Sequence, residues 1–278
     1  MIHLAPEPGG RQAFDAFWRS LLVADWDSAT GPIRFSSALT LSDLAGADFF
    51  QNTRLLLGAL AAGNGSTATA TGNLTRAFVA QLFDRLTLAA PTRESIRKVC
   101  KVVNEQDVWP LHLARVVAEC AGLVVRRNKR FHLTKAGRSS VPDDQAGVLF
   151  RRLFLAYFRR FDLHYDFHLR HVPGIQETMA VILWRLDAVA RDWTPVRGLA
   201  PQLLLPGVLQ QLHAAMTSTY DTEEWILGGY VLDPLFDLGL IERKNPGDRP
   251  AVTEKDTIRV SPLWRKFITF GPQPGCAP

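Results

Sequence analysis

The stretch AGLVVRRNKRFHLTKAGR, residues 121–138, limits the possible folds of this chain more than any other. Gly122 follows a run with helical spacing, where a left-handed helix end favours glycine. Four apolar residues alternate with polar or basic ones around a two-residue turn at Asn128-Lys129: Leu123, Val125, Phe131 and Leu133. The pattern predicts a helix end, a β-hairpin and a short closing helix capped by Thr134.

Helical patterns also precede this hairpin. Three are expected between the glycine-rich segment 61–73 and Gly122, over residues 74–86 (capped by Asn73), 93–103 and 104–122. Two more are expected upstream, over 11–26 and 42–60. The chain is therefore expected to be mainly α-helical, with β-structure confined to short hairpins.

Three helices followed by a hairpin that ends in LTKAGR resemble the winged helix-turn-helix domain, and the closing pattern resembles that of MarR-type regulators. The resemblance covers residues 71–142. It implies that the third helix enters the major groove of duplex DNA and that the hairpin, or wing, approaches the phosphates. The wider stretch from TATGNLTR to LTKAGR also resembles an uncharacterised bacterial family, which carries no function.

A related pattern recurs near the C-terminus, where LGLIERK (238–244) parallels AGLVVRR (121–127). Strand-like Ile258 and Val260 and a helix start at Ser261-Pro262 follow, so we expect a second, degenerate winged-helix-like module with a longer wing. The expected organisation is a helical region (1–70), a first module (71–142), a helical connector (143–200) and the second module (201–278).

The positive charge belongs to one segment. Residues 91–140 hold eleven Lys and Arg against four acids, an excess of seven, whereas the whole chain has a net charge of +5. Such a patch on a fitting fold is typical of nucleic-acid binding. The residues expected to face duplex DNA are two on the third helix, four on the wing and one after it: His112, Arg115, Arg126, Arg127, Lys129, Arg130 and Lys135.

The second module differs, because residues 221–270 hold seven basic residues against nine acids. Its candidate recognition helix carries Asp233 and Asp237, which repel phosphate, and Pro234, which interrupts or kinks a helix. This module is expected to be structural or protein-binding. The leading hypothesis is a non-enzymatic DNA-associated protein, with a protein-interaction scaffold as the alternative.

The connector contains the most aromatic stretch, residues 148–174, which is expected to form one helix. Its apolar stripe (Phe150, Leu153, Tyr157, Phe161) continues into His164, His168 and His171. A metal site is one interpretation, but no glutamate follows His164, and the outer histidines would lie about 10 Å apart along a helix. Packed, interfacial or pH-sensitive histidines are the alternatives, and the helix is expected to pack the two modules or a second subunit.

The sequence carries no catalytic signature. It lacks the nucleophile-elbow and phosphate-loop motifs, and its three cysteines form no C-x-x-C pair. No cofactor and no catalytic residue is therefore expected. The N-terminus has no secretory pattern and no apolar run is long enough for a membrane span, so a cytoplasmic location without membrane association is expected.

Overall fold

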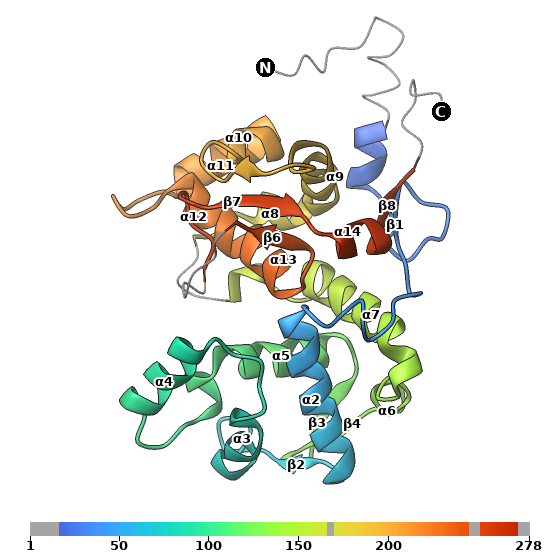
Figure 1. Cartoon of the computed structure of the whole chain (residues 1–278), viewed down its shortest axis with the longest axis vertical. Coiled ribbons are helices and arrows are strands. Elements are labelled where there is room, and N and C mark those ends of the chain that lie inside the picture. The colour runs from blue at the N-terminus through green and yellow to red at the C-terminus, as the bar shows by residue number, and fades with distance from the viewer. Residues whose placement is uncertain (1–16, 166–169, 245–250, 272–278) are drawn as a thin grey trace, which may run out of the picture.

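The computed structural model describes residues 17–165, 170–244 and 251–271. The chain is mainly helical, with small antiparallel sheets, as expected. Two units lie one above the other in Figure 1, and the long helix α7 (Ala146–Arg159) runs between them. None of the described helices is both long and apolar enough to cross a lipid bilayer.

The N-terminal unit begins at α2, and its strands pair in the order β2-β4-β3. Its elements are α2 (Asp48–Ala62), β2 (Ser66–Thr67), α3 (Arg76–Phe83), α4 (Ala90–Val99), the 3-10 turn η1 (Glu105–Asp107), α5 (Trp109–Cys120), β3 (Val124–Arg127), β4 (Arg130–Leu133) and α6 (Lys135–Ser139). The turn η2 (Asp143–Gln145) leads into α7.

The C-terminal unit repeats this order, with its strands paired as β5-β7-β6. It comprises α9 (Met179–Val189), β5 (Thr194–Pro195), α10 (Ala200–Leu203), α11 (Pro206–Ala215), α12 (Glu223–Leu227), the π-helical turn η4 (Gly228–Leu232), α13 (Asp233–Asp237), β6 (Ile241–Arg243), β7 (Thr257–Val260) and α14 (Pro262–Phe267). The short elements η3 (Leu163–Tyr165) and α8 (Pro173–Glu177) precede it, and β1 (Ile33–Phe35) pairs with β8 (Ile268–Phe270).

The hairpin β3–β4 forms with the predicted turn, but Val124 is buried and Val125, expected on the apolar side, is 44% exposed. Asn128 and Lys129 both have positive φ, at 51° and 55°, which matches the two-residue turn that suits the twist of paired strands. Gly122 ends α5 with a φ of 68°, and the Thr134 hydroxyl accepts a hydrogen bond from the Gly137 amide at the start of α6. The backbone conformation of this region therefore follows from residues that are close together in the sequence.

Two short strands pair across the predicted module boundaries. β2 pairs with β4, so the boundary after residue 70 removes a strand from its own sheet. β5 pairs with β7, so the boundary after residue 200 does the same in the C-terminal unit. The predicted cap at Asn73 is wrong, because α3 begins at Arg76 with Thr75 before it. Two-residue strands give too little alternation to be recognised in a sequence.

Helix α7 supplies the core between the units. The ring of Phe150 lies 5.9 Å from that of Phe50 in α2 and 4.8 Å from that of Phe267 in α14. The Phe154 ring lies 4.9 Å from the same Phe267. The predicted apolar stripe is thus confirmed as buried, and it packs against the chain's own units.

The prediction of one helix over 148–174 is wrong. α7 ends at Arg159, the turn η3 follows, and α8 begins at Pro173. His164 and His171 nevertheless meet, with ring centroids 4.8 Å apart at a steep angle, whereas His168 lies outside the described residues. Within the described part of the chain, no group of three or more His, Cys, Asp or Glu side chains is arranged to hold a metal ion.

Candidate nucleic-acid interface

The β3–β4 hairpin is the predicted wing, and its cationic side chains are exposed to solvent. Arg126, Arg127, Lys129 and Arg130 are all exposed, as is Lys135 at the start of α6. None of these five side chains forms a salt bridge with another described residue. The five sequence-predicted residues of the wing region are therefore accessible, and tertiary structure leaves their charges uncompensated by ion pairs.

The register of the hairpin concentrates this charge. Arg127 lies directly opposite Arg130 across β3 and β4, on either side of the turn. Like charges at directly opposed positions destabilise a strand pair, and a bound anion removes that repulsion. The Arg130 guanidinium also donates a hydrogen bond to the Thr67 hydroxyl on β2, at 3.2 Å, which ties the wing to the third strand.

The prediction that His112 and Arg115 face outward is wrong. Only 5% of His112 and 6% of Arg115 is exposed. Helix α5 packs against α2 and α7, and seven of its twelve residues, His112 and Arg115 among them, are buried. A helix covered in this way cannot present these two side chains to a DNA groove in this conformation.

A buried carboxylate explains why these polar side chains are inside. Glu105, in the turn before α5, accepts hydrogen bonds from His112 Nδ1 at 2.7 Å and from Arg115 Nε at 2.6 Å. It also accepts one from the Leu74 amide. Burial raises the pKa of Glu105, but the His112 hydrogen bond and the Arg115 charge outweigh it, so the net pKa lies below the usual range.

The network extends beyond Glu105 in three directions. His112 Nε2 is 2.9 Å from the Tyr165 hydroxyl, and the two rings are stacked. Arg115 bonds to Glu119 one turn further along α5, and its guanidinium lies 5.2 Å from the centroid of the Phe131 ring. These contacts join α5, the hairpin and the segment after α7. This network was not predicted from the sequence, although the spacing of Glu105, His112 and Arg115 is a signal that could have revealed it.

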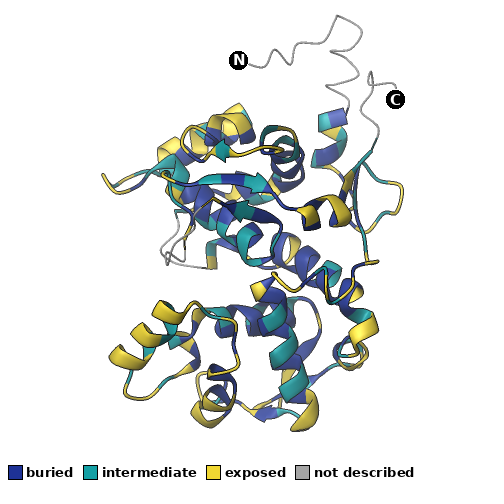
Figure 2. Ribbon diagram, viewed as in Figure 1, coloured by how far each residue is buried: buried dark blue, intermediate teal, exposed yellow. Residues whose placement is uncertain are grey.

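Helix α4 carries the other part of the basic segment. It has no buried residue, and it stands at the margin of the N-terminal unit in Figures 1 and 2. Arg93 is held by the carbonyl oxygens of Phe83 and Leu86, and Arg97 pairs with Asp84 at 2.5 Å. Lys98 and Lys101 are exposed, and among described residues they form no ion pair.

The corresponding helix of the C-terminal unit is not a basic surface. The helix changes to a π-helical turn at η4 just before Pro234, where proline cannot donate the regular backbone hydrogen bond, and it continues as α13. Asp233 and Asp237 are only partly accessible and line a pocket between the units instead of a convex outer face.

Comparison with known proteins adds one match. A family model described as the Y4jL N-terminal domain matches residues 45–146, which is less than half of the chain. The family is uncharacterised, in agreement with the second resemblance noted from the sequence, and the matched range begins just before α2 and ends at the first residue of α7. No curated protein and no solved structure matches.

Proposed function

We propose that this chain is a non-enzymatic tandem winged-helix protein that binds duplex DNA through the exposed wing of its N-terminal unit. The order of elements in each unit supports this proposal: a helix, a strand, further helices and a hairpin, with the first strand beside the second hairpin strand. The cytoplasmic location expected from the sequence belongs to the same proposal.

The main support for DNA binding is the pair Arg127 and Arg130, which lie opposite each other in the hairpin. Together with Arg126 and Lys129 they form an exposed cationic hairpin that is free of salt bridges within the described structure. Arginines on a short hairpin are suited to phosphate oxygens, which they bind with charge-assisted hydrogen bonds. Because His112 and Arg115 are buried, the proposed contact is to the DNA backbone, without base reading by α5.

Fluorescence anisotropy with a labelled random-sequence duplex tests this proposal. Each phosphate contact contributes about 0.9 to the slope of log affinity against log salt, so four wing contacts contribute roughly 3 to 4. Changing Arg126, Arg127, Lys129 and Arg130 together to alanine is expected to abolish binding at moderate salt and to flatten that slope.

A control removes the same charge elsewhere. Arg191, Arg197, Lys255 and Arg265 are exposed cations of the C-terminal unit, and their replacement by alanine is expected to leave most of the affinity intact. Absence of binding by the unaltered protein at low salt, or equal losses in the two fourfold variants, contradicts the proposal.

A protein-docking role is the second candidate, and α4 favours it. This helix buries none of its residues, and Val99 at its end and Val102 just beyond are 76% and 52% exposed. An apolar helix end without a covering element is typical of a docking surface. A partner that is retained by the wing variant and lost on changing Val99 and Val102 to aspartate would support docking over DNA binding.

A further inference from the structure

A pocket of about 250 Å³ lies where the two units meet, and the DNA-binding proposal does not use it. Its walls come from α5, from α7 and the segment after it, from α12 to α13, and from residues 251–252. The side chains that define its chemistry are four aromatic rings and two carboxylates: Trp109, Tyr157, Phe161, Trp225, Asp233 and Asp237.

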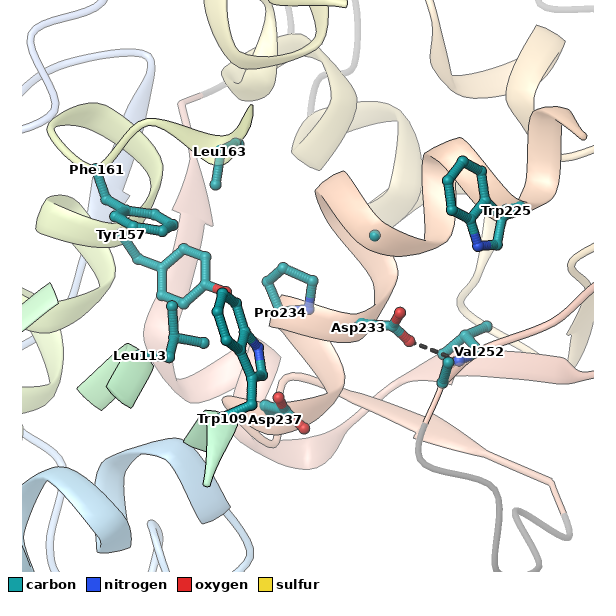
Figure 3. A pocket seen from close by; sticks show the side chains of 12 residues that line it. Trp109, Leu113, Tyr157, Phe161, Leu163, Trp225, Asp233, Pro234, Asp237 and Val252 are labelled. Atoms are coloured by element: carbon teal, nitrogen blue, oxygen red, sulfur yellow. Dashed lines mark hydrogen bonds between the residues drawn. The ribbon is translucent and has the colours of Figure 1, made fainter. Parts of the chain in front are cut away.

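The aromatic rings lie on both sides of the pocket. Figure 3 shows Trp109, Tyr157 and Phe161 on one side, and Trp225 on the other, beyond Asp233. Trp109 and Trp225 remain 41% and 39% exposed, although both are large apolar residues at the junction of the units. The faces of such rings attract cations, and tryptophan does so most strongly.

The carboxylates lie one helical turn apart on α13. Asp233 accepts a hydrogen bond from the Val252 amide at 2.5 Å, as drawn in Figure 3. Asp237 has no hydrogen-bond or ion-pair partner among the described residues. Burial raises the pKa of Asp233 to about 6 and that of Asp237 to about 7, because it removes water from the charged carboxylates. The positive charge of Arg243 lowers both pKa values by less than burial raises them.

The charged side chains described near the pocket do not neutralise Asp233 and Asp237. Arg243 acts on both carboxylates, but it already forms a buried ion pair with Asp256. Asp48, at the start of α2, adds a further negative charge near Asp237. Among the described residues, the pocket therefore combines aromatic walls with more carboxylates than compensating cations, and a neutral apolar ligand would leave that charge unmatched.

We propose that this pocket binds a small organic cation, an alkylammonium or alkylguanidinium group, between the aromatic rings and the carboxylates of α13. The N–H groups of such a ligand donate to Asp233 and Asp237, and its alkyl stem lies against Trp109 and Tyr157. The volume admits a short chain of a few carbon atoms. The same chemistry is supplied by a free amine or by a lysine or arginine side chain of a peptide.

Isothermal titration calorimetry of the full chain at pH 8 tests the proposal. The probes are n-butylamine, agmatine and a short lysine-containing peptide, with 1-butanol as the neutral analogue of the amine. The amine or the guanidine is expected to bind at millimolar concentration or tighter, whereas 1-butanol is not. Binding of the peptide alone assigns the site to a protein side chain, which retains the proposed chemistry.

Asp237→Asn keeps the size of the side chain and removes its charge, so it is expected to weaken binding at least tenfold. Asp144→Asn, at an exposed position in η2, is the matched control and is expected to leave binding unchanged. Titrations at pH 6.5 in buffers of different ionisation enthalpy are expected to show proton release, because a bound cation favours the ionised carboxylates. Absence of binding by every probe, equal binding of 1-butanol, or full affinity in the Asp237 variant overturns the proposal.

Discussion

The hydroxyl of Thr134 donates a hydrogen bond to the carbonyl oxygen of Gly122 at 2.7 Å, so one residue caps α6 and fixes the end of α5. Ser261 makes the same bond to Gly239, also at 2.7 Å, and caps α14. Gly122 and Gly239 have nearly equal positive φ values, 68° and 69°. The similarity of the two units therefore extends to individual hydrogen bonds between side-chain hydroxyls and the backbone.

This relationship predicts the effect of removing the hydroxyl. Thr134→Val keeps the shape of the side chain but loses the bond to Gly122 and the cap on Gly137, so the free energy of unfolding should fall by about 1–2 kcal/mol. Urea denaturation followed by circular dichroism measures the change. Thr134→Ser retains both bonds and should cost far less, and equal losses in the two variants would exclude the hydroxyl as the cause.

Gly137 should not tolerate a side chain. A Cβ atom at this position would lie 2.1 Å from the Leu123 carbonyl oxygen, which belongs to the backbone and cannot rotate away. Gly137→Ala is therefore expected to lower the melting temperature strongly. Gly58→Ala is the control: it lies in α2 with open space around it, and it should raise stability by about 0.5–1 kcal/mol because alanine favours a helix. The reverse order of melting temperatures would contradict this packing.

Glu105→Gln should destabilise the N-terminal unit. The change removes the carboxylate that His112 and Arg115 share and leaves Arg115 with Glu119 alone, and loss of one partner of a buried pair costs about 3 kcal/mol or more. Chemical denaturation at pH 7 measures this, and Glu94→Gln on the exposed face of α4 is the matched control with little expected effect. A loss no larger than that of the control would show that the network contributes nothing to stability.

The same variant has a predicted pH signature. The pKa of Glu105 is lowered by folding, so its stabilisation is complete above the usual glutamate pKa and is lost as the pH falls through the lower, folded-state pKa. The unaltered protein should therefore lose this contribution in acid. Glu105→Gln should show a correspondingly shallower acid dependence of the free energy of unfolding.

Asp237 should have the opposite effect on the pH dependence of the free energy of unfolding. Folding raises its pKa from 3.8 to about 7, so stability falls as the pH rises through that interval, because ionisation is less favourable in the folded chain. Asp237→Asn should increase the free energy of unfolding at pH 8, by roughly 1–3 kcal/mol, and have little effect at pH 4. Thermal denaturation across this range measures the difference, and a variant less stable than the unaltered protein at pH 8 would contradict the assignment.

Several features of the N-terminal unit were predictable because they depend on neighbours in sequence. The turn at Asn128 and Lys129 needs positive φ, and Gly122 and Thr134 are suited to a helix end and a helix start. The predicted alternation of the hairpin was wrong at one position, because Val124 is buried and Val125 is exposed. The wing cations are exposed, and their role as a DNA interface stays a prediction.

The helical half of that interface was wrong because helical periodicity shows which residues share a face, but not what covers that face. His112 and Arg115 are polar, and a polar face is usually solvated; here Glu105 compensates them and α7 covers the helix. The pocket with Asp233 and Asp237 was missed for a related reason, since its walls come from residues more than a hundred positions apart.

The sequence by itself determined the local conformations of this protein: where helices stop, where the wing turns, and that the pattern recurs. Only the tertiary structure decided the third strand of each sheet, the burial of α5 and the meeting of the two units at α7. Caps and turns are set by dihedral preferences and hydrogen bonds within a few residues, whereas burial depends on long-range packing that balances the desolvation of each polar group against the partners it finds.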